Sequence, residues 1–243
     1  MARRGSGRGD GFRLRAAWAC ARLRALMNAN VLIDSLLLYI CLLIVITFHE
    51  AAHAWVAWKC GDDTARMQGR VSLNPIVHMD PVGTVLLPLL AFGLAAANSA
   101  LAGFIIGWGR PVPVNPSNLR HRRVQDTLIA LAGPGMNILL ALGAVVLARL
   151  LLAGGAGSLA EIAVTLAQLS LFLCFFNLIP VPPLDGSHVL RHASGMTEEL
   201  YLSIARYGFL ILIVLIQFPI VQRLLHVCTI GTLNGMMALV GLA

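Results

Sequence analysis

The sequence predicts an all-α, polytopic membrane protein that carries a metal site in one of its spans. Hydrophobic residues make up 58% of the 243 residues and charged residues 12%, against about 45–50% and about 25% in ordinary soluble domains. Several apolar stretches approach or exceed the roughly 20 residues that cross a bilayer. One of them ends in His49-Glu-Ala-Ala-His53, which places ionisable groups at a depth where they are costly.

The N-terminal residues 1–29 are predicted to form a mobile, basic leader before a single membrane domain over 30–243, whose core covers about 31–192. Seven of the 17 arginines lie in the first 24 residues. Beside a membrane span, such charges more often meet anionic headgroups or fix topology than bind nucleic acid. We therefore expect the lipid bilayer as a partner, and no nucleic acid.

Four spans are predicted, at about 31–58, 126–152, 162–179 and 200–218. A last segment, about 227–243, is marginal for a full crossing, so one or two C-terminal spans are expected. The loop 108–116 carries three prolines and cannot be helical. The apolar segment before it, about 83–107, is interrupted by a proline, two glycines and an asparagine: Pro88, Gly93, Asn98 and Gly103.

His49 and His53 predict a metal site because residues four apart lie on one face of a helix and can reach the same ion. Glu50 stands beside that face, where a carboxylate can take a proton from a metal-bound water. The five cysteines are scattered and form no Cys-x-x-Cys pair, so neither a disulfide framework nor a thiolate zinc site is indicated. The pattern is typical of a zinc hydrolase.

A catalytic zinc usually has three protein ligands and one open position, so a third ligand must come from elsewhere in the chain. Asp185 is favoured because it follows an apolar span in a proline-rich turn that ends in glycine, although an ordinary Asp-Gly surface turn has the same pattern. The other candidates are histidines, aspartates and glutamates after His53, namely His78, Asp80, Glu161, His188, His192, Glu198 and Glu199.

Three motifs together resemble the site-2 protease family of intramembrane zinc metalloproteases. They are FHEAAHA at 48–54, AGPGMN at 132–137 and FNLIPVPPLDG at 176–186. LNP at 73–75 and GWGRPVPVNP at 107–116 resemble the small bacterial subgroup that lacks PDZ and CBS domains. The resemblance covers about residues 31–192, whereas the leader and the last two segments match nothing diagnostic.

The resemblance implies that His49, His53 and Asp185 bind one zinc ion and that Glu50 is the general base. It also implies that Asn177 helps to hold the substrate or the oxyanion, although a helix-end amide that bonds a backbone carbonyl is an equal alternative.

For several further polar residues the sequence predicts a structural role or leaves alternatives open. Asn137 is expected to pack the contact between the second and third full spans through its amide. His78 is either a gating residue or a solvated loop histidine, and His188 and His192 are expected at the surface.

The predicted site also constrains the topology. His53 and Asp185 each follow the far end of a span, and both must reach one ion at distances near 2 Å. The interrupted segment 83–107 is therefore expected to enter the membrane and return, which leaves the spans at 31–58, 126–152 and 162–179 as a three-helix catalytic core.

Orientation depends on the arginine and lysine count of each face, which is nine against nine. The count becomes nine against two if translation starts at Met27, and the site then faces the cytoplasm of a bacterial cell. The expected function is hydrolysis of peptide bonds in or near the transmembrane helices of other membrane proteins. A catalytically silent scaffold or chaperone and a metal transporter are the alternatives, and the oligomeric state is open.

Overall fold

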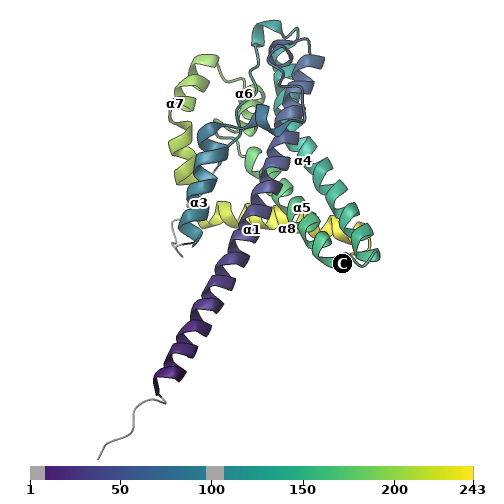
Figure 1. Ribbon diagram of the computed structural model, residues 1–243. Coiled ribbons are helices and arrows are strands. Elements are labelled where there is room, and N and C mark those ends of the chain that lie inside the picture. The colour runs from purple at the N-terminus through teal and green to yellow at the C-terminus, as the bar shows by residue number, and fades with distance from the viewer. Residues whose placement is uncertain (1–8, 97–106, 243) are drawn as a thin grey trace, which may run out of the picture.

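The computed structural model describes the backbone of residues 9–96 and 107–242, and the side chains of 33–94 and 107–242 (Figure 1). Within these residues the chain is helical and holds no strand. Three of the helices are long and apolar enough to cross a membrane, or four spans result if the bent C-terminal pair counts as one. The predicted all-α membrane fold is therefore confirmed.

Three helices form the centre of the molecule: α1 (Gly9–Lys59), α4 (Arg122–Ala153) and α5 (Gly157–Asn177). α4 and α5 are antiparallel and joined by a short turn at Gly154 and Gly155. Their contact is lined by alanines that are almost fully buried, namely Ala141, Ala144, Ala148, Ala160, Ala163 and Ala167. Small side chains let helix backbones approach closely where lipid offers no hydrophobic driving force. These helices are the predicted catalytic core.

The segment that was predicted to be re-entrant, about 83–107, returns to the place where it started. It begins with a π-helical turn (Pro81–Leu86), capped by the Asp80 carboxylate, which accepts from the Val82 and Gly83 amides. α3 (Leu87–Ala96) follows. The Trp108 amide then donates to the Gly83 carbonyl at 3.3 Å, and the Thr84 hydroxyl donates to the Trp108 carbonyl at 2.7 Å. The two ends of the segment lie side by side, as a re-entrant path requires.

The interruptions in this segment act differently from the prediction. α3 runs without a break through Pro88 and Gly93, because proline is tolerated in a first helical turn. The helix geometry changes one residue earlier, between Leu86 and Leu87. Asn98 and Gly103 lie outside the described residues.

The extended residues after Trp108 are pinned by a buried arginine. The Arg70 guanidinium donates to the carbonyls of Val77, Arg110 and Pro111, the last at 3.1 Å. The Arg110 amide donates to the His78 carbonyl at 2.8 Å. Short elements occupy the adjoining loops: α2 (Thr64–Met67) and 3-10 turns at Pro75–His78 and Pro116–Asn118.

Of the C-terminal helices, only the last packs across the core rather than along it. α6 (Gly186–Ser194) follows the proline-rich turn and ends at Gly195, which has a left-handed backbone. α7 (Glu198–Leu215) and α8 (Pro219–Leu239) are bent by 83° at their junction. α8 lies across α4 and α5, where its Leu233 and Met236 join their buried cluster (Figure 1).

Several helices are longer than predicted. α1 extends back to Gly9, into the residues assigned to the leader, and its first half projects away from the other helices (Figure 1). α4 and α8 begin four and eight residues before their predicted starts at 126 and 227. The polar first turns of α1 and α4 carry no hydropathy signal, and Pro219 starts α8 in the position where proline is favoured. The division into leader and membrane domain stays a prediction.

Candidate metal centre

Three side chains from separate parts of the chain meet between α1, α4 and the turn that precedes α6. His49 and His53 are buried on α1, with 4% and 7% of their surface exposed. Asp185 comes from the turn after α5. These are the three ligands expected from the sequence, and they are the one group of this kind among the described residues.

The spacing of their atoms suits a tetrahedral ion. Nε2 of His49 lies 3.1 Å from Nε2 of His53, and the two nitrogens lie 3.2 and 3.4 Å from Oδ2 of Asp185. Ligands about 2.0–2.1 Å from a tetrahedral zinc stand about 3.3 Å apart. Oδ2 of Asp185 is buried and accepts no hydrogen bond from the described protein atoms, as expected of an atom that would bind a cation. The residues present therefore fit a zinc ion.

α4 orients both imidazoles. Nδ1 of His53 donates to the Ile129 carbonyl at 2.6 Å, so its Nε2 carries the lone pair that a metal requires. Nδ1 of His49 lies 3.1 Å from the Asn137 amide nitrogen, while Oδ1 of that amide is buried without a partner. A half-turn of the amide lets Oδ1 accept from Nδ1 and frees Nε2 of His49 for the metal.

Asn137 thus has a role that differs from the prediction. Its side chain contacts His49 of α1, and the contact between α4 and α5 runs through its backbone carbonyl, which accepts from the Ser170 hydroxyl at 2.8 Å.

Gly133 explains the glycine-rich motif of α4. A Cβ at this position would overlap Nε2 of His53 and lie 2.5 Å from Cε1 of His49. Only glycine lets the helix backbone come this close to both rings. One turn earlier, Ala130 lines the cavity beside the site, and Pro134 cannot donate to its carbonyl.

A cavity of about 470 Å³ opens beside the three residues. Glu50 lines it together with Asn177 and the extended residues from Gly107 to Val114. A Cβ on Gly109 would lie 3.4 Å from Oε1 of Glu50, so the extended backbone lies directly over this carboxylate. The cavity therefore brings the Glu50 carboxylate beside the three side chains that could hold a metal.

The Asn177 amide nitrogen donates to the Leu173 carbonyl at 3.0 Å, which satisfies a backbone group at the end of α5. The residue also lines the cavity. A role in holding substrate stays a prediction, with the amide oxygen and the second amide hydrogen as the groups that could serve it.

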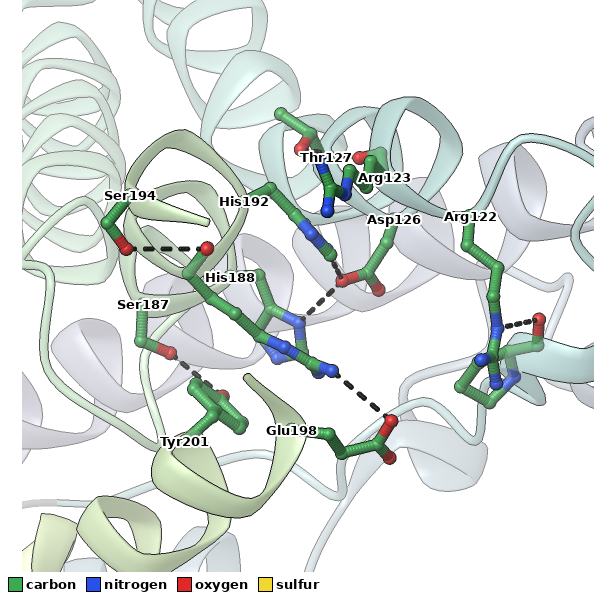
Figure 2. A network of polar contacts seen from close by, with 12 residues as sticks. Arg122, Arg123, Asp126, Thr127, Ser187, His188, His192, Ser194, Glu198 and Tyr201 are labelled. Carbon is green, nitrogen blue, oxygen red and sulfur yellow. Dashed lines mark hydrogen bonds and ion pairs between the residues drawn. The ribbon is translucent and has the colours of Figure 1, made fainter. Parts of the chain in front are cut away.

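A second polar cluster ties α6 to α4 (Figure 2). Oδ2 of Asp126 lies 3.1 Å from Nδ1 of His188 and 2.5 Å from Nε2 of His192, so one carboxylate oxygen joins two turns of α6. His188 and His192 are surface histidines only in part: 37% and 15% of their side chains are exposed, and both also contact Asp126 of α4. Because α6 begins at the residue after Asp185, this clamp helps to hold that carboxylate in place.

Sequence reasoning missed the roles of Arg70, Asp126 and Asp62, because none of them lies in a recognisable motif. Asp62 is fully buried and accepts from Thr64, Asn118 and the Asn115 amide. His78 was left open between gating and solvation. Its side chain is 1% exposed and Nε2 bonds the Ser72 carbonyl at 2.7 Å, which excludes a solvated histidine.

Comparison with known proteins gives consistent matches. The sequence profile described as "Peptidase family M50" matches residues 37–155 and 153–217. The protein named "Putative zinc metalloprotease YwhC" of Bacillus subtilis is 39% identical over 191 residues, which cover 75% of this chain and 81% of that protein.

Two further relatives of the same description are both called Rip2. The protein from Mycolicibacterium smegmatis is 30% identical over 74% of this chain and 66% of its own length. That from Mycobacterium tuberculosis H37Rv is 28% identical over 73% of this chain and 65% of its own length. No solved structure matches.

Proposed function

Because the chain belongs to peptidase family M50 and is a zinc metalloprotease of the membrane, we propose that it hydrolyses peptide bonds in or near the transmembrane segments of other membrane proteins. One observation carries the proposal. The cluster of His49, His53 and Asp185 lies among apolar helices of spanning length, and the cavity beside it is bounded by α1 and α5. A substrate that reaches it there is a membrane protein.

His49, His53 and Asp185 are the proposed zinc ligands. The near-equal separations of their atoms support this, as do the Nδ1 contact from His53 to the Ile129 carbonyl and the orphaned oxygen of Asp185. Burial raises the pKa of the Asp185 carboxyl, but the two imidazoles lower it further, to well below its usual range. Asp185 is therefore ionised at neutral pH, which is the form that binds a cation.

Glu50 is the proposed general base. A zinc ion held at this site would lower the pKa of a bound water towards ~7 and polarise the scissile carbonyl. Glu50 would take a proton from that water and deliver it to the leaving amine, and its position on the wall of the cavity beside the three residues supports this role. The Gly109 backbone lies close to the Glu50 carboxylate and narrows the path by which other molecules reach it. Asn177 also lines the cavity, where its side chain would orient the peptide.

The extended residues 107–115 are the proposed clamp for an unwound substrate. The Arg70 guanidinium donates hydrogen bonds to the Arg110 and Pro111 carbonyls, which fixes this backbone, and the next residues, Val112 and Val114, line the cavity. A helical substrate shields its carbonyls in intrahelical bonds, so it must be extended before attack, and a strand edge can hold it there. The re-entrant segment of about 83–107 is the candidate gate.

The enzyme is an integral membrane protein, and we place it in a bacterial cell membrane with its site toward the cytoplasm. The loops at 60–80 and 107–121 and the turn before α6 then face the cytoplasm. This orientation assumes that translation starts at Met27, since nine lysines and arginines then lie on the face of the site against two on the other face. Single cysteines at the loops 70–80 and 110–120 test this topology, because both must be labelled from the same side.

The test of function compares wild type with Glu50→Gln by proteomics of the cell membrane. Transmembrane fragments should be lost and their uncleaved precursors should accumulate in the variant, while zinc stays at one per chain in both. Full cleavage by zinc-loaded Glu50→Gln would contradict the mechanism. Unchanged fragments in a variant with the zinc content of the wild type would favour the silent scaffold. Transport of zinc across the membrane of vesicles that contain the chain would favour a transporter.

A further inference from the structure

A second groove adjoins the catalytic cavity at greater depth in the membrane. It has a volume of about 610 Å³ and lies between α1, α5 and α8. The two spaces share four wall residues: Leu42, Gly107, Leu173 and Phe176. A molecule bound in the groove would therefore lie next to the cavity in which the proposed hydrolysis occurs.

The groove carries polar groups where lipid would favour apolar ones. Gln168 of α5 is exposed and, among the described residues, has no hydrogen bond. It lies 11 residues from the start of α5 and 9 from its end, about 16 and about 14 Å along the axis. This is close to the centre of a hydrocarbon core about 30 Å thick.

The wall that α8 contributes to the groove is polar as well. Gln222, His226 and Thr229 are spaced by four and three residues, which places them on one helix face, and all three line the groove. Thr229 is only 4% exposed, and its hydroxyl has no partner among the described residues. An unpaired hydroxyl and an unpaired amide at this depth are each costly unless a polar partner arrives.

We propose that this groove binds the transmembrane helix of the substrate and selects helices that carry a polar side chain, such as Asn, Gln, Ser or Thr, near their midpoint. Gln168 and Thr229 supply the hydrogen bonds. The inference rests on the proposed function, because it names the class of substrate for that same cavity. Acyl chains offer no hydrogen-bonding group at this depth, and the shared wall with the catalytic cavity favours a substrate over a second copy of the chain.

The experiment uses the full chain with Glu50→Gln in phosphatidylcholine vesicles, so that binding is measured without cleavage. The probes are two fluorescent peptides of about 20 residues, built from leucine and alanine, one with a central asparagine and one with leucine in its place. Energy transfer from the chain gives their affinities. The asparagine peptide should bind about threefold to thirtyfold more tightly, the range of one interhelical hydrogen bond.

Gln168→Leu and, as a second variant, Thr229→Val should each reduce this preference. Gln217→Leu is the matched control, since Gln217 is exposed between α7 and α8 but does not line the groove, and it should keep the preference. Equal binding of the two peptides, or a preference that survives both groove variants, would overturn the proposal. So would photocrosslinks from Leu225 that map to phospholipid or to a second copy rather than to the peptide.

Cleavage by the zinc-loaded wild type separates this inference from the proposed function. Binding that depends on Gln168 but is followed by no cleavage supports the groove and contradicts the hydrolase. Cleavage of both peptides at equal rates and affinities supports the hydrolase and contradicts the groove.

Discussion

Replacement of Gly133 by alanine tests the central geometry of the site. The added methyl would overlap Nε2 of His53 and lie 2.5 Å from Cε1 of His49, about 0.9 Å closer than the 3.4 Å at which ordinary contacts begin. Either α4 must move away or the rings must turn. Metal sites tolerate deviations of only about 0.2 Å in ligand distances, so the three proposed ligands should hold one ion less tightly.

We expect Gly133→Ala to weaken zinc binding about tenfold to a hundredfold, or about 1.4 to 2.8 kcal/mol. Overpacking should also destabilise the fold by about 1–3 kcal/mol. The assay is zinc competition against a chromophoric chelator with the purified chain in detergent, and thermal unfolding followed by circular dichroism shows whether the variant is folded.

Gly135→Ala is the control, because it makes the same change two residues further along α4, where no atom lies within 4 Å of the added Cβ. It should bind zinc as the wild type does. If a folded Gly133→Ala also keeps wild-type affinity, the ligands are not held against the α4 backbone and the reasoning is refuted.

Three further predictions follow from other contacts of the site. Asn137→Leu should weaken zinc binding about tenfold or more by removing the partner of His49 Nδ1, whereas Asn137→Asp, which still accepts from that nitrogen, should retain it in the same chelator competition. Asp126→Ala should release α6 and speed the loss of zinc to excess chelator several-fold. Glu198→Ala breaks the ion pair between exposed Glu198 of α7 and Arg191 of α6, and it should not speed the loss of zinc. Burial raises the pKa of the Asp62 carboxyl, but hydrogen bonds from its neighbours lower this pKa by more, so it lies below its usual value. Ionised Asp62 therefore stabilises the fold above pH about 4, which is the pKa of the group in the unfolded chain. This stabilisation is lost as the pH falls through the lower pKa of the folded chain. The protection factors of the amides in the loop 61–75 against hydrogen exchange should fall in that acid range in the wild type, and they should already be low at pH 7 in Asp62→Asn.

The part of the site that was predictable from sequence has a local origin. The spacing of His49 and His53 is a property of any α-helix, so two imidazoles on one face could be inferred before the fold was known. The broken pattern of 83–107 and the need for His53 and Asp185 to meet together predicted the re-entrant path. The bond between Trp108 and Gly83 agrees with it.

The residues that hold the site could not be read in this way. Arg70, Asp126 and His78 act through partners 6 to 66 positions away in the chain, and no periodicity relates such pairs. In the sequence, each is one charged or polar residue near the end of an apolar segment, a place where solvated side chains are common. The clamp of α6 likewise depends on how α6 packs against α4.

The sequence by itself determined that the chain is a membrane protein with apolar spans and that one span carries two histidines and a carboxylate in the spacing of a metal site. Composition and helical periodicity decide these features, because both act over a few turns of one helix. The tertiary structure alone decided that Gly133 and Asn137 of α4 shape the histidines, that Asp126 secures the turn of Asp185, and that polar groups of α5 and α8 face one groove. These depend on distances between helices, which are set by packing across the whole core.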